Sequence, residues 1–384
     1  MADEIVIEDG QGMRKIAALV DGRLQEIIFY DETKANEGNV YLGKIIKKIA
    51  TANGKKSYFV NIGTTEVFIN AQERELEDLE ANEGQDIILQ ISQEKRAEKN
   101  AKGVRFLQLA GEYVVFCPYG SEVAVSQKID DEDKCEHLFN LVSENIECSG
   151  GWIVRTNAAM ADDTAIKSEM AKLQELFKDI IGKAKNAIAP ALLYKRDCGL
   201  DEMLVRNADS LRKITVNNHI LEQELTKYGD KVIYQTEPFK QYGIDEQIVE
   251  ALSREVKLKS GGRIFIEETK ALVAIDVDSG GSLEQGSIGR LNCEAAAEIA
   301  RQIILRNLAG KIVIDFAGFS EYKFLKSAID VLEQGLQADF AKSRVLGLSR
   351  GGNVEILRSR RHPSLSDVLM KECDVCHGYG RVEK

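Results

Sequence analysis

The stretch Leu272-Val-Ala-Ile-Asp276-Val-Asp278 decides the fold, because it reads as an apolar strand that ends in two acids. Alternate residues of a strand share a face, so Asp276 and Asp278 point the same way, about 7 Å apart. The apolar residues between them then point into a core. The sequence therefore predicts two carboxylates at the end of a strand that is otherwise buried.

A second strand with one acid follows this stretch. Lys311-Ile-Val-Ile-Asp315-Phe316 reads as another buried strand, with Asp315 near its end. The residues between the two strands predict a helix from Asn292 as N-cap to Leu308, with Gly310 just past its end. A strand–helix–strand unit makes its two strands parallel neighbours, with both carboxyl ends at one edge of the sheet.

The three acids Asp276, Asp278 and Asp315 would then meet in a crevice at this edge. Such a cluster is costly to desolvate unless a cation neutralises it. The alternative is that each acid caps a strand end and faces water, as most aspartates do. We favour a hard-cation site, because all of these acids lie in apolar strands joined by one crossover.

Composition describes an ordinary protein of two or three domains. Of the 384 residues, 44% are hydrophobic and 29% are charged, as in typical soluble proteins. The start of the chain lacks the basic and apolar regions of a signal peptide, and no apolar run approaches membrane-spanning length. Seven scattered cysteines argue against a secreted disulfide framework, so we expect a cytoplasmic protein without membrane contact. The net charge of −11 argues only weakly against nucleic acid, because the distribution of charge matters more.

The first third of the chain predicts β structure. Residues 4–30 form short strand-like runs separated by turns at Asp9-Gly10 and Asp21-Gly22. Five further short strands suggest a small barrel. These strands are Asn39–Ile46, Ser57–Gly63, Val67–Asn70, Asp86–Ile91 and Tyr113–Cys117.

Basic and aromatic side chains are interleaved in this barrel. The segment from Asn39 to Thr65 contains five lysines and no acid: Lys44, Lys47, Lys48, Lys55 and Lys56, with Tyr41, Tyr58 and Phe59 among them. A second basic cluster precedes the last strand and consists of Lys95, Arg96, Lys99, Lys102 and Arg105. Basic side chains hold phosphates and exposed aromatics stack on unpaired bases, so the pattern suits single-stranded nucleic acid. An alternative of similar weight is a barrel whose aromatics are core and whose lysines face water.

The pattern after the barrel mixes strands and helices. Gly151–Thr156 reads as a strand that ends in Arg155 and a hydroxyl, and Asp163 or Thr164 is predicted to cap an amphipathic helix. The other predicted elements are a hairpin of Arg263–Glu267 with Ala271–Asp276 and a helix over Glu321–Ala341. The chain contains no GxxxxGK[ST] phosphate loop and no Gly-x-Ser-x-Gly elbow.

Cys373-Asp-Val-Cys376 supplies half of a structural zinc site. A closed tetrahedral site needs four ligands, whereas one CxxC gives two thiolates. The pair could instead be redox-active, or close a site with His362 or His377 of the same chain. Since no second CxxC is present, the simplest complete site joins the same pair from two subunits across a two-fold axis.

Taken together, these segments resemble the catalytic half of the bacterial ribonuclease E/G family, over essentially the whole chain. No single motif is decisive, but their order and spacing are specific. The matching segments are Gly38–Lys44, Tyr58–Gly63, Ile153–Thr156, Arg254–Gly262, Ala274–Asp278, Asn292–Gln302, Ile312–Phe316 and Cys373–Gly380.

The resemblance implies a mixed α/β fold of several subdomains. An RNase H-like subdomain would be split by an inserted S1 (OB-fold) barrel and a 5′-sensor region, and a DNase I-like α/β subdomain and a zinc linker would follow. The implied ranges are 1–38 and 191–250 (RNase H-like), 39–118 (S1 barrel), 119–190 (5′-sensor), 251–368 (DNase I-like) and 369–384 (zinc linker).

The resemblance also implies an endoribonuclease that cuts single-stranded, AU-rich RNA with Mg²⁺, in RNA processing or decay, often with a preference for a 5′-monophosphate. By this analogy Asp276 and Asp315 hold Mg²⁺, and Asp278 is a third active-site residue. The implied RNA-binding residues are Phe59, Phe68 and Lys102, and, for the 5′-phosphate, Arg155, Thr156 and Arg344. Cys373 and Cys376 would share Zn²⁺ with a second subunit in a homodimer.

Two departures from the family pattern bear on activity and assembly. Asp278 stands where the family usually has asparagine, and the following Gly280-Gly-Ser-Leu lacks an arginine often found there. The small helical domain that pairs dimers into tetramers in longer relatives is missing, so we expect a dimer.

Two alternative functions stay open. One is a catalytically weakened RNA-binding protein of the same fold, and the other is a metal-dependent deoxyribonuclease, which explains the acids but explains the barrel less well.

Overall fold

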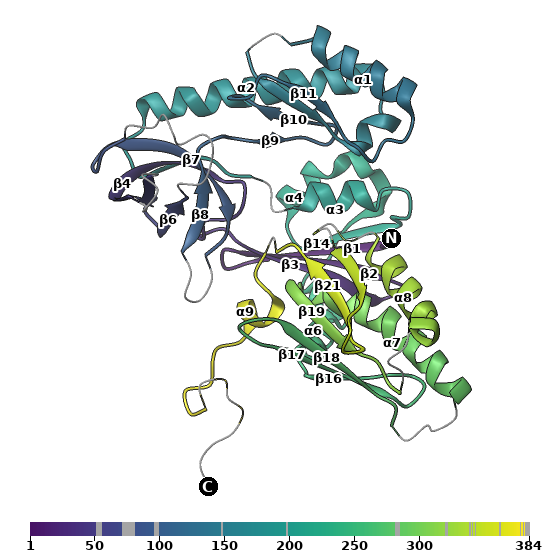
Figure 1. Cartoon of the computed structure of the whole chain (residues 1–384). Helices are drawn as coiled ribbons and strands as arrows, with labels where there is room; N and C mark the ends of the chain where they lie inside the picture. Colours follow the sequence, from purple (N-terminus) through teal and green to yellow (C-terminus); the bar gives the residue numbers. More distant parts are fainter. Residues whose placement is uncertain are drawn as a thin grey trace. The chain divides into compact units, whose positions relative to one another are not determined.

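The computed structural model describes residues 1–50, 56–70, 81–95, 100–146, 149–196, 199–280, 285–318, 322–337, 339, 341, 343–360, 362–376, 378 and 380, except for the side chains of 285–287. The chain divides into unit 1, which is Met1–Tyr30 with Arg206–Lys384, and unit 2, which is Asp31–Val205. The predicted mixed α/β class is confirmed (Figure 1). Within the described ranges, no helix combines the length and the apolar character needed to cross a membrane.

A five-stranded sheet in unit 1 joins the start of the chain to its middle. Its strands are β1 (Glu4–Gly10), β2 (Met13–Val20), β3 (Arg23–Asp31), β14 (Lys213–Val216) and β15 (Val232–Tyr234), in the order β15-β14-β1-β2-β3, accompanied by α4 (His219–Glu224), α5 (Pro238–Gln241) and α6 (Ile244–Ala251). The turn predicted at Asp21-Gly22 is confirmed, with left-handed φ values of 47° and 75° that suit a tight hairpin. The other turn falls at Gln11-Gly12 and not at Asp9-Gly10, because strand pairing continues to Gly10 opposite Met13.

A six-stranded sheet forms the rest of unit 1. Its strands are β16 (Glu255–Lys257), β17 (Arg263–Glu268), β18 (Val273–Asp278), β19 (Gly310–Asp315), β20 (Ser343–Leu348) and β21 (Val354–Arg358), in the order β16-β17-β18-β19-β21-β20. The predicted β17–β18 hairpin is confirmed, and β18 and β19 are parallel neighbours as expected. Helices α7 (Gln285–Leu305) and α8 (Tyr322–Leu336) lie side by side and share one apolar core with the sheet (Figure 1). The short helix α9 (Leu365–Leu369) follows.

The crossover helix begins earlier than predicted. Because α7 begins at Gln285, Asn292 lies inside the helix and is not its N-cap. The side chain of Asn292 is fully buried, and it donates to the main-chain oxygen of Ala317 at 3.0 Å and accepts from the Ala317 N–H at 3.2 Å. Ala317 follows β19 by two residues, so these bonds fix the chain just beyond Asp315 to the helix.

A closed barrel forms the first part of unit 2. Its strands are β4 (Val40–Ala50), β5 (Lys56–Asn61), β6 (Glu66–Ile69), β8 (Ala101–Val104) and β7 (Asp86–Gln93), and the ring closes because β7 also pairs with β4. Glycine is required at Gly43, where an added Cβ would lie 2.4 Å from a methyl carbon of Val60. The fifth strand was predicted wrongly, because Ala101–Val104 completes the ring. The five-stranded ring is consistent with an OB-type barrel.

The strand predicted at Tyr113–Cys117, which we had assigned to the barrel, belongs to a separate four-stranded sheet. Its strands are β9 (Leu109–Ala110), β10 (Val114–Cys117), β11 (Val123–Val125) and β12 (Gly151–Val154), in the order β11-β12-β10-β9. Helices α1 (Glu132–Glu144) and α2 (Asp163–Asn186) contribute to its core, and β13 (Ala191–Tyr194) and α3 (Leu200–Arg206) follow. The predicted amphipathic helix is confirmed as α2. Its predicted cap at Asp163 or Thr164 is wrong, because both residues lie within the helix and Asp162 is at the N-cap position.

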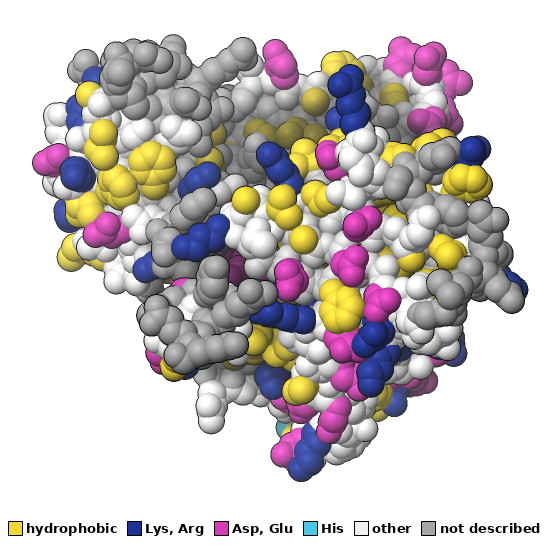
Figure 2. Space-filling view, turned by 60° about the horizontal axis from the view of Figure 1, so that its bottom comes forward, with side chains coloured by type: hydrophobic (Ala, Val, Ile, Leu, Met, Phe, Trp, Pro, Cys, Tyr) yellow, Lys and Arg dark blue, Asp and Glu magenta, His cyan; other side chains and the backbone are white. Residues whose placement is uncertain are grey.

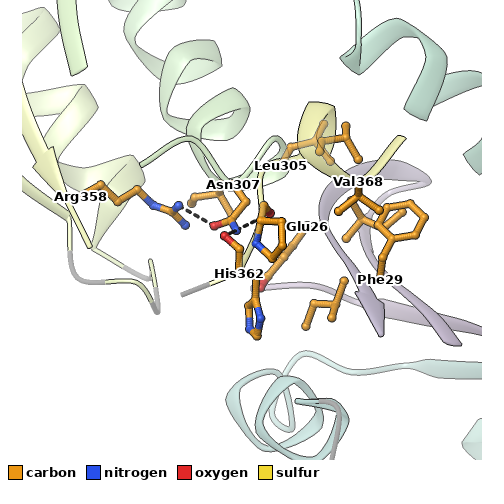
Figure 3. Close-up of a pocket in the computed structure, with 12 residues that line it drawn as sticks. Glu26, Phe29, Leu305, Asn307, Arg358, His362 and Val368 are labelled. Atoms are coloured by element: carbon orange, nitrogen blue, oxygen red, sulfur yellow. Dashed lines mark hydrogen bonds between the residues drawn. The ribbon is translucent and has the colours of Figure 1, made fainter. Parts of the chain in front are cut away.

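A buried polar cluster fixes the segment that follows β21 (Figure 3). Asn307 donates from Nδ2 to the main-chain oxygens of His362 and Pro363 at 2.8 and 2.9 Å, and it accepts from Arg358 at 2.7 Å. Arg358 also forms a two-pronged pair with Asp339 at 2.8 and 2.9 Å, and these two side chains are only 4% and 2% exposed. The neighbouring cavity of about 50 Å³ is too small for a nucleotide, so the cluster is structural.

We predict that Asp339→Ala lowers the free energy of unfolding by about 3–5 kcal/mol, because it leaves the buried guanidinium of Arg358 without its counter-charge. Urea unfolding of wild type and variant measures this difference. Arg360→Ala is the matched control, because the Arg360–Asp367 pair is long at 3.6 Å and partly exposed, and its loss should change stability by about 0–1 kcal/mol.

The pH dependence of stability provides a second readout for the same pair. Burial would raise the pKa of Asp339, but bonds from Arg358 and Ser343 outweigh it and lower the pKa below 3.8. The stabilisation is therefore complete above the unfolded-state pKa and is lost as pH falls through the lower folded-state value. Asp339→Ala should remove this acidic loss, and an unchanged profile would contradict the assignment.

Candidate functional site

Asp276 and Asp315 lie directly opposite each other on neighbouring parallel strands, since β18 and β19 pair in the register Asp276↔Asp315. Ile275 and Val277, on either side of Asp276, are 2% and 4% exposed, whereas both acids are exposed. The two-residue period of a strand therefore directs the apolar side chains into the core and the acids away from it. The predicted alternation along this strand is confirmed.

The charges at this edge favour a cation. Partial burial first, and then the negative charges of Asp315 and Asp278, raise the pKa of Asp276 above its usual range. Among the described residues, no group of three or more His, Cys, Asp or Glu side chains is arranged to hold a metal ion. The edge thus offers two facing carboxylates, a donor set that fits Mg²⁺, because this ion usually keeps several waters and is bound through one or two carboxylates and substrate phosphate.

Asp278 differs from the other two acids because a cation already lies beside it. Arg263 sits opposite Asp278 on β17 and donates from Nη2 to Oδ2 at 2.9 Å, while the Gly280 N–H donates to Oδ1 at 3.0 Å. The bond from Gly280, together with Arg263, lowers the pKa of Asp278 despite some desolvation. Arg263 was not identified as a site residue from the sequence. The predicted hairpin was the signal that could have identified it, because cross-strand neighbours of opposite charge interact.

A row of four side chains crosses neighbouring strands of the barrel. Its members, which we call the barrel row, are successive cross-strand partners: Lys47 on β4, Phe59 on β5, Phe68 on β6 and Lys102 on β8. The two half-buried rings lie 5.2 Å apart with their planes inclined by 52°, and both lysines are exposed. Strand register therefore brings together all three predicted barrel residues and adds Lys47, which sequence reasoning had left in a general basic cluster.

Other members of the predicted basic and aromatic clusters are placed differently. Tyr41 and Tyr58 lie in the barrel core, and Lys44 is paired with Asp86 at 2.7 Å. Lys55, Arg96 and Lys99 fall outside the described residues.

On the face displayed in Figure 2, basic and acidic side chains lie next to one another. A mixed surface of this kind gives little electrostatic attraction, so local groups such as the barrel row matter more than net charge.

Arg155 follows β12 in unit 2, and its guanidinium is already engaged. It donates from Nη1 to a main-chain oxygen and from Nη2 to Glu202 Oε1 at 3.2 Å. Thr156 is exposed, and its hydroxyl lies 3.0 Å from the hydroxyl of Ser126. These groups offer donors for an anion, with Glu202 as a competitor for Arg155. Arg344 is exposed in β20 of unit 1, so it belongs to a different unit from Arg155.

The two cysteines of the CxxC motif are free thiols, with Cys373 exposed and Cys376 half-buried. The main-chain N–H groups of Cys376 and Val375 point to the Cys373 sulfur and lower the pKa of this thiol. A turn that stabilises thiolate in this way suits a zinc ligand. His377 is outside the described residues, and His362 lines the small cavity of Figure 3.

Comparison with models of known protein families identifies a match over about two thirds of the chain. The model of the Ribonuclease E/G family matches residues 108–361 of the chain. This range includes Arg155 and all three acids, and it begins just after the last strand of the barrel.

Individual relatives extend the similarity to the whole chain. Ribonuclease G of Escherichia coli (strain K12) is 29% identical over 420 residues, covering 100% of this chain and 85% of the relative. Ribonuclease G of Haemophilus influenzae is 29% identical over 419 residues, covering 100% and 84%. Ribonuclease E of Escherichia coli (strain K12) is 31% identical over 405 residues, covering 95% of this chain but 37% of that longer relative.

Proposed function

The chain belongs to the ribonuclease E/G family, and from this premise we propose that it is a Mg²⁺-dependent endoribonuclease for single-stranded RNA, acting in RNA processing or decay. The observation that carries the proposal is the register that sets Asp276 opposite Asp315. The barrel row supports a single-stranded substrate, because bases must leave a duplex stack before they can stack on protein rings.

Asp276 and Asp315 would hold the Mg²⁺. When bound, this ion supplies a Lewis acid for phosphate oxygens and lowers the pKa of a coordinated water. The chain itself contributes geometry and fixed charge, since strand pairing aligns the carboxylates and Asn292 fixes the backbone beyond Asp315. The chain has four histidines, which are His137, His219, His362 and His377. None of them lies in the acidic motif, so we assign no imidazole as general base.

The Arg263–Asp278 pair favours an active enzyme over the catalytically weakened RNA-binding protein. A third free carboxylate in place of the usual asparagine would repel the substrate phosphate. Arg263 offsets that charge at 2.9 Å and leaves Asp276 and Asp315 as the metal-binding pair. We therefore do not assign Asp278 to the metal, but to the polar surroundings of the active site.

Substrate recognition would involve two further groups in unit 2. Phe59 and Phe68 would stack on bases while Lys102 holds phosphate. Arg155 and Thr156 would bind a 5′-monophosphate, because a guanidinium and a hydroxyl both donate hydrogen bonds to phosphate oxygens. An incoming dianion would have to displace Glu202 from Arg155. Arg344 remains assigned to this site by family resemblance alone.

The proposed assembly is a cytoplasmic homodimer that shares one Zn²⁺. Each subunit would contribute Cys373 and Cys376, which completes a tetrahedron of four thiolates around a two-fold axis. The zinc would have a structural role and would take no part in RNA cleavage.

The first prediction concerns the two facing acids. Asp276→Asn and Asp315→Asn should each reduce Mg²⁺-dependent cleavage by about 100-fold or more, because each removes a metal-binding charge that supports several kcal/mol of transition-state stabilisation. RNA affinity should remain close to that of wild type, because the barrel is unchanged. Cleavage of a 5′-monophosphorylated single-stranded RNA and binding in EDTA measure the two effects.

Asp330→Asn, which neutralises an exposed acid in α8, is the matched control for these two variants. Wild-type cleavage by Asp276→Asn or Asp315→Asn would contradict the metal site. Intact RNA binding without cleavage by the wild type would instead support the binding-protein alternative, and preferential cleavage of DNA would support a deoxyribonuclease.

The second prediction concerns the 5′ end. Arg155→Ala should reduce the preference for 5′-monophosphorylated over 5′-hydroxyl RNA by about tenfold or more, since a hydrogen bond to a charged group contributes about 1.5–3 kcal/mol. Glu202→Gln should strengthen the same preference, because it removes the competing carboxylate. Cleavage rates of paired RNAs that differ only at the 5′ end measure both effects. Equal slowing of both RNAs by Arg155→Ala would show that Arg155 is structural.

The third prediction concerns assembly. Native mass spectrometry should find two chains per zinc, and Cys373→Ser should dissociate the dimer or weaken it markedly, because it leaves only two of the four thiolates, one from each subunit. Cys135→Ser is the control, since this cysteine lies far from the motif in sequence. One zinc per monomer, or an equally stable dimer without zinc, would exclude the shared site.

A further inference from the structure

An open cavity in unit 2 lies beside the barrel and is not part of the barrel row. Its volume is about 650 Å³, which is within the range of sites for small organic ligands. Its lining comes from β4, from β7 and the segment before it, and from the segments after β8 and β10. The lining residues used below are Lys44, Asp86, Arg105 and Tyr119.

Tyr119 gives the cavity a fixed aromatic wall. This residue is 47% exposed although it follows the apolar strand β10. Its ring packs at a steep angle against Phe106, with centroids 5.4 Å apart, and against Phe177, with centroids 6.0 Å apart. Two ring contacts hold the tyrosine in place while a large part of it stays in contact with solvent. An immobilised, exposed ring is suited to stacking on a planar ligand.

Two basic side chains line the same cavity. Lys44 is bonded to Asp86 at 2.7 Å and to the main-chain oxygen of Gly84 at 3.3 Å, and its side chain is still 45% exposed. Arg105 is half-buried and, within the described part of the chain, makes no hydrogen bond or ion pair. Its charge acts on the Tyr119 hydroxyl, since burial raises the pKa of Tyr119 and Arg105 lowers it in part. A guanidinium that makes no bond to the described residues and lies next to an aromatic ring is suited to bind a nucleotide.

We propose that this cavity binds one nucleotide of a single-stranded RNA, with the base stacked on Tyr119 and the adjacent phosphate held by Arg105 and Lys44. The proposal rests on the proposed RNA substrate and adds a contact outside the barrel row. A bulge in β4 lies between Lys44 and Lys47, so their partners on β5, Asn61 and Phe59, are two positions apart, which corresponds to about 7 Å along the strand. The cavity therefore continues the same strand that carries one end of the barrel row, and an RNA chain can reach both.

The test measures RNA affinity by fluorescence anisotropy, in EDTA and in an Asp276→Asn background, so that no cleavage interferes. Tyr119→Ala should weaken binding of a single-stranded oligonucleotide by about 5-fold to 150-fold, as expected for one lost stacking contact. Arg105→Gln should weaken binding and reduce the slope of log affinity against log salt by about 1, because one phosphate contact is lost. Phe139→Ala and Lys172→Gln are matched controls, since they remove an exposed ring from α1 and an exposed charge from α2 of the same unit.

The outcomes separate this proposal from the one on which it rests. Wild-type affinity in both Tyr119→Ala and Arg105→Gln, with weakened binding by Phe59→Ala, would overturn the cavity site and leave the RNA-binding function intact. No RNA binding by the unmodified chain would overturn both. If free uridine monophosphate competes as strongly as RNA of equal nucleotide concentration, the cavity is a site for free nucleotides and the RNA contact is wrong. If Tyr119→Ala has a markedly lower melting temperature than the wild type, the RNA affinities of Tyr119→Leu and Arg105→Gln test the proposal instead.

Discussion

The parallel pairing of β18 with β19 is the constraint on which the rest of the site depends. It places two carboxylates of like charge opposite each other, which is unfavourable by itself and raises the pKa of Asp276. The arrangement persists because the other faces of the same strands bury Ile275 and Ile314 in the core beneath α7 and α8. Asn292 adds a direct link from the helix to the chain beyond β19. The core thus stabilises a pair of facing like charges, which the proposed Mg²⁺ would neutralise.

Of the three acids, Asp278 is neutralised by a neighbouring positive side chain. Arg263 pairs with Asp278 across the hairpin, so the departure from asparagine at this position does not add a free third charge. In unit 2 the barrel presents aromatic rings between two lysines, which suits an extended, unpaired nucleic acid. In the proposed function, catalytic chemistry and substrate capture would therefore reside in separate units of one chain.

Much of unit 1 could be predicted from local sequence because its signals are local. The strand–helix–strand unit, the β17–β18 hairpin and the alternation around Asp276 follow from short-range periodicity. Predictions failed where the partner lies far along the chain. Val114–Cys117 has the same apolar pattern as a barrel strand, but it pairs with Gly151–Val154 in another sheet. Asn292 resembled an N-cap, yet its partner is Ala317. The Arg263–Asp278 pair and the barrel row also needed the exact register between strands, which periodicity does not give.

Anomalous diffraction from crystals of the chain with Mn²⁺ and a non-cleavable single-stranded RNA tests the central claim most directly. Mn²⁺ substitutes for Mg²⁺ at carboxylate sites and its position is visible without assumptions about the ligands. The account predicts an ion bound by the carboxylates of Asp276 and Asp315 and by an RNA phosphate, with Asp278 still paired to Arg263. An ion held by Asp278, or an RNA-bound structure with no ion between Asp276 and Asp315, would contradict it.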